Sequence, residues 1–314
     1  MSVAVADPGR RSAPRRSVRH GRSRLARRES RRFHLFALPW LIGFVFFSGG
    51  PIVASLVISF TDWELLGTPK FVGVANYTKL LADPNFGIAV RNTAYFGAGS
   101  ALCGVIFNFV LALMLNLRVA GQSIFRTIIY LPSVLSGIAT ALLWVNLLHP
   151  DYGLVNRLLG LVGLVGPGWL LDPNWAIPGL IIMSVWTTGN AMVIFLAGLQ
   201  GIPDHLYEVA QLDGAGWWSR FRHVTVPMMS PIIFFNLIVG FIGSLQAYSL
   251  ILFMTDGGPN NATLVLGLYV FRYAFQYFEM GYASTIAWAL FFLIMVFTAI
   301  QFVLARRWVH YEHK

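Results

Sequence analysis

Residues 201–231 read GIPDHLYEVAQLDGAGWWSRFRHVTVPMMSP and form a long polar interruption between two very apolar segments. Pro203 and Asp204 are typical of the first turn of a helix. Apolar residues then recur at the spacing of one helical face: Leu206, Val209 and Ala210. Asp213-Gly214 indicates a turn after this helix, because glycine adopts backbone angles that are closed to other residues.

A second short helix is predicted after this turn. Apolar and polar residues separate onto its two sides: Trp217, Trp218 and Phe221 on one, Ser219, Arg220 and Arg222 on the other. Pro227 and Pro231 mark the return to an apolar run. We therefore predict a helix-turn-helix that projects from a membrane, with one apolar face and a basic far end. Such a shape suits docking into another protein.

The composition places the whole chain in a membrane. Of its 314 residues 56% are hydrophobic and 11% charged, and the mean hydropathy is +0.65. Soluble domains carry about 25% charged residues. At about 20 residues per span, the length allows six or seven spans and no large soluble domain. A single cysteine, Cys103, excludes an intrachain disulfide.

The net charge of +10 is concentrated at the N-terminus, which argues against a nucleic-acid-binding body. Residues 1–33 are rich in Arg and Ser and are predicted to be a disordered, basic cytoplasmic tail that touches anionic lipid headgroups. A transit peptide is the competing interpretation, but no apolar helical face is apparent. Residues 34–308 would form the membrane domain, and 309–314 a second cytoplasmic tail.

We predict an all-α integral membrane protein with six transmembrane helices and a cytoplasmic helix-turn-helix loop at 201–231. The six spans are charge-free segments near 34–60, 93–117, 127–148, 175–199, 228–254 and 283–304. Backbone groups in lipid must satisfy their own hydrogen bonds, so helices are the expected form. Residues 154–171 and 262–278 are predicted to be amphipathic helices on the outer surface.

Arginine and lysine determine the predicted orientation. With the N-terminal tail inside, the inner segments hold 18 of the 23 basic residues and the outer segments hold 5. Both termini and the loop at 201–231 are therefore expected in the cytoplasm, with the protein in a bacterial or archaeal cell membrane.

Several kinds of chemistry are excluded by the residues present. A phosphate-binding loop needs Gly-Lys before Ser or Thr, and Lys70, Lys79 and Lys314 all follow other residues. The seven histidines show no metal-ligand spacing, so neither a metal nor a cofactor is predicted. The predicted spans contain no Asp, Glu, Lys or Arg, which argues against a proton-coupled carrier.

Neutral polar and aromatic residues within the spans suggest a path for a neutral, hydroxyl-rich solute such as a sugar. The proposed residues of this path lie in the fourth and fifth spans: Trp186, Thr188, Asn190, Ser244, Gln246 and Tyr248. The alternative is packing between helices, where small and polar residues also collect.

The central stretch also has a family signature. Glu208-Val209-Ala210, Asp213-Gly214-Ala215 and the later Val226-Pro227 resemble the EAA loop of ATP-binding-cassette (ABC) importer permeases, with mild departures at Val209 and Val226. The alternative is an ordinary amphipathic loop. The resemblance implies that the helix around Glu208 enters a cleft of an ATPase. It assigns this coupling role to Glu208, Ala210, Asp213, Gly214, Ala215, Phe221 and Pro227.

Further motifs resemble the carbohydrate branch of this family, as found in maltose, lactose and glycerol-3-phosphate permeases: Phe-Val-Gly-Val-Ala-Asn-Tyr at 71–77, Asn92-Thr93, Tyr130-Leu131-Pro132 and Thr255-Asp256-Gly257-Gly258-Pro259. The resemblance implies a second homologous permease subunit, two ATPase subunits that hydrolyse ATP, and an extracytoplasmic solute-binding protein. The chain itself would not be an enzyme. It lacks the large periplasmic insertion of the maltose permease.

The predicted function is therefore that of a permease subunit in an ATP-driven importer of a sugar or related solute, working by alternating access. Glycerol-3-phosphate is an alternative solute. An ATP-independent channel or secondary carrier is the rival class, and it would need no ATPase subunits.

Overall fold

The computed structural model describes residues 24–65, 67–117 and 121–310, and the chain divides into two units, Met1–Ala54 and Ser55–Lys314. The first unit is described from Arg24 and is helical. Its elements are α1 (Arg24–Phe44), a π-helical turn (Val45–Gly49) and the first half of α2 (Gly50–Ser59). The apolar part of this segment, Leu35–Ser59, is long enough to cross a membrane.

Helix α1 begins inside the segment predicted to be a disordered tail, about ten residues before the predicted span. Residues 1–23 lie outside the described residues, and the tail stays a prediction there. The same holds for 311–314 of the predicted C-terminal tail.

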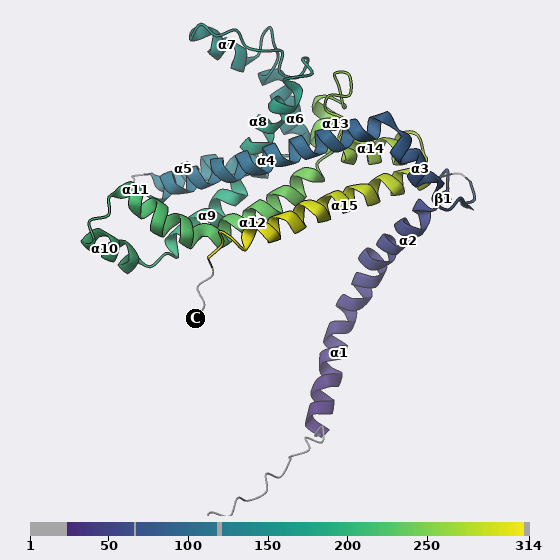
Figure 1. Cartoon of the computed structure of the whole chain (residues 1–314), viewed down its shortest axis with the longest axis horizontal. Helices are drawn as coiled ribbons and strands as arrows, with labels where there is room; N and C mark the ends of the chain where they lie inside the picture. Colours follow the sequence, from purple (N-terminus) through teal and green to yellow (C-terminus); the bar gives the residue numbers. More distant parts are fainter. Residues whose placement is uncertain (1–23, 66, 118–120, 311–314) are drawn as a thin grey trace, which may run out of the picture. The chain divides into compact units, whose positions relative to one another are not determined.

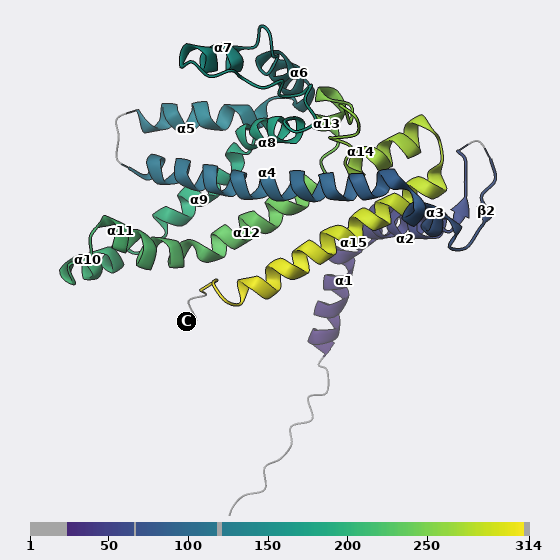
Figure 2. The same cartoon turned by 45° about the horizontal axis from the view of Figure 1, so that its top comes forward.

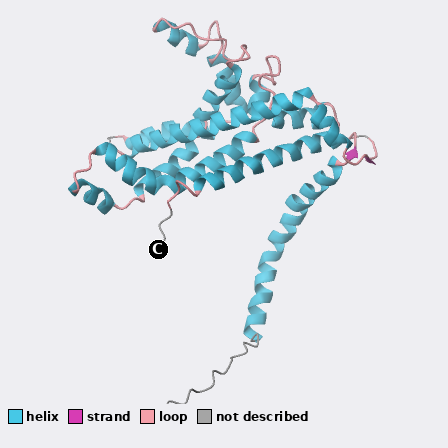
Figure 3. Cartoon of the chain, viewed as in Figure 1, coloured by secondary structure: helices cyan, strands magenta, loops and turns pink. Residues whose placement is uncertain are grey.

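The second unit is mostly helical (Figures 1 and 3). Its helices are α3 (Ala75–Ala82), α4 (Pro84–Asn116), α5 (Gln122–Tyr130), α6 (Gly137–Leu147), α7 (Leu154–Leu161), α8 (Ala176–Trp186), α9 (Gly189–Gln200), α10 (Asp204–Leu212), α11 (Trp217–Arg220), α12 (Val226–Leu245), α13 (Ser249–Met254), α14 (Leu266–Phe271) and α15 (Met280–Ala305). A 3-10 turn covers Leu131–Val134, and π-helical turns cover Phe221–Thr225 and Arg272–Gln276. Strands β1 (Thr61–Asp62) and β2 (Lys70–Phe71) form a small antiparallel pair.

The predicted helical membrane fold is confirmed, with four to six candidate spans in the described part of the chain. Four helices are long and apolar enough to cross a membrane: Leu35–Ser59, Pro84–Asn116, Trp217–Leu245 and Met280–Ala305. Two further spans would each be a bent pair of helices: Gln122–Val134 with Gly137–Leu147, bent by 101°, and Ala176–Trp186 with Gly189–Gln200, bent by 52°. The predicted fifth span ends earlier than expected, because its helix stops at Leu245 and α13 follows after a break.

Helix α4 is the central element of the second unit. Helices α8, α9 and α12 pack along it, and α12 also packs against α15 (Figure 2). Small residues on the buried face of α4 allow this close approach: Ala89, Gly97, Ser100, Ala101, Gly104 and Ala112. One core cluster surrounds Phe96, and a second surrounds Phe195 and Met229. Because α4 contributes to both clusters, it joins the two ends of the unit.

The second helix of the 201–231 stretch differs from the prediction, because it does not end before the membrane span. Helix α11 continues through the π-helical turn into α12, giving one helix from Trp217 to Leu245. Pro227 is the second residue of α12 and lacks an N–H to donate to the preceding turn. The wider π turn just before it accommodates the missing donor, so a proline that suggested a boundary lies inside a continuous helix.

The two predicted outer helices also differ from each other. Helix α7 has no buried residue, as expected for a surface helix. Helix α14 is not a surface helix, since Leu266, Leu268 and Tyr269 are buried in the first core cluster.

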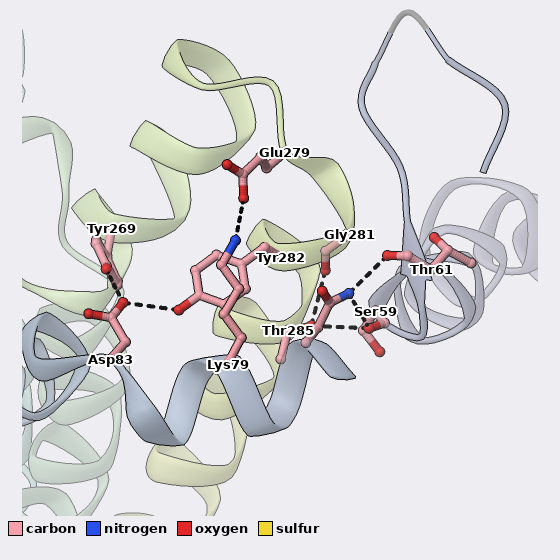
Figure 4. Close-up of polar contacts among 10 residues, drawn as sticks. Ser59, Thr61, Lys79, Asp83, Tyr269, Glu279, Gly281, Tyr282 and Thr285 are labelled. Atoms are coloured by element: carbon pink, nitrogen blue, oxygen red, sulfur yellow. Dashed lines mark hydrogen bonds and ion pairs between the residues drawn. The ribbon is translucent and has the colours of Figure 1, made fainter. Parts of the chain in front are cut away.

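A polar cluster joins α3, α14 and α15 where α4 begins (Figure 4). Its members, which we call the clamp, are Lys79, Asp83, Tyr269, Glu279 and Tyr282. Asp83 accepts hydrogen bonds from the hydroxyls of Tyr269 and, at 3.0 Å, Tyr282, and it also caps α4. Burial, and then the hydrogen bond to Asp83, raise the pKa of Tyr269 well above its ordinary value, so its hydroxyl stays protonated and can donate. Lys79 pairs with Glu279 at 2.8 Å.

Candidate functional site

A cavity of about 350 Å³ lies between α4, the α8–α9 pair and α12. Its wall is apolar apart from hydroxyl and amide groups, which come from all three walls: Ser100, Asn108, Ser184, Thr187, Thr188, Asn236 and Ser244. None of its lining residues is charged. Such a wall can hydrogen-bond a neutral polar solute while excluding ions, which would lose their hydration without compensation.

The break between α8 and α9 positions two of these hydroxyls. Thr187 and Thr188 lie between the two helices, and the Thr188 Oγ1 donates to the Val185 carbonyl oxygen at 2.7 Å. The Nδ2 of Asn108 donates to the Thr188 Oγ1 at 2.7 Å and to the Gly104 carbonyl oxygen at 2.8 Å. This network fixes the Asn108 amide in one orientation.

The Oδ1 of Asn108 is buried and has no hydrogen-bond partner among the described residues. A buried amide oxygen without a partner costs free energy, typically about 1–3 kcal/mol. A hydroxyl from water or from a solute would satisfy it. Asn108 is therefore the group in the cavity wall with a chemical need for a ligand.

The structure brings together two of the six residues proposed for the solute path. Thr188 and Ser244 line the cavity, and the Ser244 Oγ donates to the Gly97 carbonyl oxygen at 3.1 Å. Trp186 packs edge-on against Trp144, with ring centroids 5.7 Å apart, and is partly buried against the first core cluster.

The other three residues lie outside the cavity lining. Asn190 is exposed on α9. Gln246 and Tyr248 lie in the break between α12 and α13, where the Tyr248 ring stacks on Phe271. Sequence reasoning missed Ser100 and Asn108, although an amide in the middle of the 33-residue apolar α4 was a usable signal.

The loop at 201–231 has a defined turn. Helix α10 ends at Leu212, and Gly214 follows in the left-handed region with φ +78°, as its predicted role requires. The Ala215 N–H donates to the Ala210 carbonyl oxygen at 2.9 Å, which closes the turn. A Cβ at position 214 would meet no atom within 4 Å, so the backbone angle, and not space, requires glycine here.

The apolar face of α10 is divided. Leu206 and Tyr207 pack against the chain's own second core cluster, and the Tyr207 hydroxyl lies 3.1 Å from the Thr225 Oγ1. Leu206 therefore packs against the chain itself. Val209 and Leu212 point away from this cluster, and Leu212 is 89% exposed.

The remaining residues with a predicted coupling role differ in their exposure. Glu208 and Asp213 are exposed, whereas Ala210, Ala215, Phe221 and Pro227 are half-buried. Trp217, which is 70% exposed, stacks on Phe221 at 5.9 Å. The Glu208 carboxylate forms no hydrogen bond or ion pair with the described residues. An exposed apolar face beside an unpaired carboxylate is a surface suited to a protein partner.

Comparison with known proteins identifies the class to which this fold belongs. Residues 102–310 match the family described as the inner membrane component of binding-protein-dependent transport systems. The chain is 37% identical over 298 residues to the probable ABC transporter permease protein YesP of Bacillus subtilis (strain 168), covering 93% of this chain and 96% of YesP. It is also 37% identical to the lactose transport system permease protein LacF of Rhizobium radiobacter, covering 87% of this chain and 93% of LacF.

A solved structure shows the same fold. The bacterial ABC transporter involved in the import of the acidic polysaccharide alginate includes a chain that superposes with a TM-score of 0.76 at 26% identity, covering 90% of this chain and 99% of that one. This chain therefore belongs to the binding-protein-dependent transport family and is an ABC transporter permease subunit in a membrane. The family assignment predicted from the EAA-like loop is confirmed.

Proposed function

We propose that this permease subunit transports a sugar or a related hydroxyl-rich solute into the cell, driven by ATP hydrolysis in partner subunits. The cavity between α4, α8–α9 and α12 carries the proposal, because it is uncharged, polar and provides an unpaired acceptor at the Asn108 Oδ1. The name of the relative LacF, a lactose permease, supports a saccharide.

The loop would couple the ATPase to the spans. Glu208, Val209 and Leu212 would contact an ATPase cleft, where the carboxylate could meet a basic side chain or a helix N-terminus. Because α11 and α12 are one helix, a displacement of the loop at Trp217 would be transmitted directly to the α12 wall of the cavity. The energy would come from different affinities of the ATPase states for the two conformations of the permease.

The proposed assembly contains a second homologous permease, two ATPase subunits and an extracytoplasmic solute-binding protein. The family description, which specifies binding-protein-dependent transport, supports the last of these. A solved alginate ABC transporter is in complex with a periplasmic protein bound to an alginate pentasaccharide. We also propose that both termini and the loop are cytoplasmic, as the distribution of arginine and lysine indicates.

Reconstitution tests this function. Liposomes that contain this chain and its permease partner should accumulate sugar only when ATPase subunits, ATP and the solute-binding protein are added. Uphill uptake without the ATPase subunits would instead establish a secondary carrier.

Single substitutions test the cavity. Asn108→Ala and Thr188→Ala should each reduce the uptake rate several-fold, since a lost hydrogen bond to a neutral partner is worth about 0.5–1.5 kcal/mol. Asn190→Ala is the matched control, because it removes an exposed asparagine outside the cavity. An equal loss in Asn190→Ala would contradict this placement of the solute.

A further inference from the structure

A second and larger cavity, of about 650 Å³, lies at the other end of the spans, where α4 begins. Arg91, Asn92 and Tyr95 on α4 form one wall, and Asn174 and Asn260 stand on loops across from them. We infer that this cavity binds the acidic unit of a saccharide, with Arg91 as the partner of its carboxylate. This inference rests on the proposed function as a saccharide permease and specifies its solute further.

The charge in the cavity lining favours an anion. Arg91 is exposed and forms no hydrogen bond or ion pair with any described residue. The neighbouring acidic groups, by contrast, all have partners. Asp83 accepts from two tyrosine hydroxyls, the Asp172 Oδ1 accepts from the Asn174 backbone N–H at 2.9 Å, and Asp256 pairs with Arg272 at 3.2 Å. Among the described residues that line the cavity Arg91 alone is charged. The fork of donors on its guanidinium matches a carboxylate.

The other wall groups suit a sugar ring. Tyr95 follows Arg91 by one helical turn, so both side chains lie on one face of α4, and Tyr95 is 51% exposed. An exposed aromatic ring beside a cation offers a surface on which the apolar face of a sugar can lie. The Asn260 amide has no hydrogen-bond partner among the described residues and can pair with hydroxyls.

The wall opposite α4 is held in place by a buried side chain. The Nδ2 of Asn92 donates to the carbonyl oxygens of Asn261 and Leu264, at 2.9 and 3.1 Å. Arg272 secures the same turn through the Asp256 carbonyl oxygen at 2.6 Å. The loop that contains Asn260 is therefore tied to α4, and Asn92 is a positioning residue.

Two cavities of different chemistry thus lie along one helix. The first is uncharged and reaches Phe96, while the second contains Arg91. A saccharide with both acidic and neutral units would suit both cavities, whereas a purely neutral sugar offers no carboxylate to the Arg91 guanidinium.

A matched pair of ligands tests this inference. The probes are a disaccharide of one glucuronate and one neutral hexose, and the same disaccharide with its carboxylate reduced to a primary alcohol. Binding to the purified, assembled transporter in lipid nanodiscs is measured by calorimetry. The acidic form should bind about 10- to 100-fold more tightly, the range expected for a hydrogen bond to a charged group. Added salt should reduce this difference.

Variants assign the difference to this cavity. Arg91→Gln should abolish the preference for the acidic form, and Arg91→Lys should retain part of it. Gly87→Leu should weaken both ligands, because Gly87 lines the cavity and a Cβ there would meet no atom within 4 Å. Gly160→Leu is its control, at a helical glycine that is equally open and lies outside the cavity.

Other outcomes overturn the inference. Equal binding of the two disaccharides, no binding of either, or a preference that survives Arg91→Gln would each exclude the acidic site. If Arg91→Gln alters only the affinity for the solute-binding protein, the guanidinium is a protein contact instead. The proposed function fails separately, when no saccharide shows ATP-dependent uptake in the reconstituted transporter.

Discussion

The clamp at the start of α4 and the loop beside its end differ in how completely their charged groups are paired. At its start, the clamp places Asp83 against two tyrosine hydroxyls and Lys79 against Glu279 (Figure 4). At its end, Leu113 and Leu117 lie beside the loop, where Glu208 has no partner among the described residues. Both ends are helical and contain charged residues, so secondary structure does not distinguish them.

The difference predicts which of the two regions contacts another protein. A polar cluster whose groups are mutually satisfied stabilises the chain that contains it. An unpaired carboxylate beside the exposed Val209 and Leu212 contributes little to this chain's own stability. Changes in the clamp should therefore reduce stability, whereas changes in the loop should reduce coupling.

The largest expected effect is that of Glu208→Lys on transport. The substitution reverses the charge on the exposed side of α10 and disturbs no hydrogen bond within the described chain. Sugar uptake should fall at least about tenfold, since a charge-assisted contact is worth about 1.5–3 kcal/mol and would become repulsive. The ATPase subunits should also be lost more readily on purification.

Asp151→Lys is the matched control for this variant. It makes the same change of charge on a side chain that is 88% exposed and lies outside the loop. Its uptake should remain close to that of the wild type. Normal uptake and full retention of the ATPase in Glu208→Lys would show that the loop has no coupling role.

A smaller but still large effect is expected for Gly281→Leu in the clamp region. A Cβ at position 281 would overlap the Thr61 carbonyl oxygen, a backbone atom that cannot move aside cheaply. Overpacking reduces stability by about 1–3 kcal/mol, and the contact with a backbone atom should put Gly281→Leu near the upper end of this range. The melting temperature of the detergent-solubilised complex should fall by several degrees, while Gly87→Ala, at an open position, should leave it unchanged. A melting temperature of Gly281→Leu equal to that of the wild type would contradict this close contact.

The sequence was informative where a local pattern determines structure. Apolar runs predicted the spans, and Asp213-Gly214 predicted the left-handed turn, because both depend on neighbouring residues. The sequence did not predict the continuous helix through Pro227, because a proline indicates a helix boundary unless the preceding turn is known to be π-helical.

The surroundings of individual side chains could not be predicted from the sequence, because they depend on tertiary packing. Of the residues proposed for the solute path, Thr188 and Ser244 line the cavity, whereas Trp186 packs into the core. Composition cannot distinguish these cases, because polar and aromatic residues within spans serve both packing and binding. The pairing of Asp83 with Tyr269 and Tyr282 spans almost 200 residues and has no local signal.

A moderate effect is expected for Asp83→Asn. Asparagine retains the shape and can still cap α4, but it removes the charge that both tyrosine hydroxyls meet. The free energy of unfolding should fall by about 2 kcal/mol, because hydrogen bonds to charged groups contribute more to stability than hydrogen bonds between neutral groups. The double variant Asp83→Asn with Tyr282→Phe should lose less stability than the two single variants together, as expected for groups in direct contact. Strictly additive effects on the melting temperature would contradict the clamp.

The smallest expected effect is that of Glu279→Gln, although its ion pair with Lys79 is short at 2.8 Å. The two side chains are 54% and 38% exposed, so water screens their attraction, and such pairs contribute about 0–1 kcal/mol. Lys79→Gln should reduce stability slightly more than Glu279→Gln, because the Lys79 Nζ also lies 4.4 Å from the centre of the Tyr282 ring. Raising the salt concentration should remove the effect of Glu279→Gln and leave that of Asp83→Asn, whose partners are more buried. If Glu279→Gln reduced stability more than Asp83→Asn, the exposed ion pair, and not the Asp83 carboxylate, would be the main source of stability in the clamp.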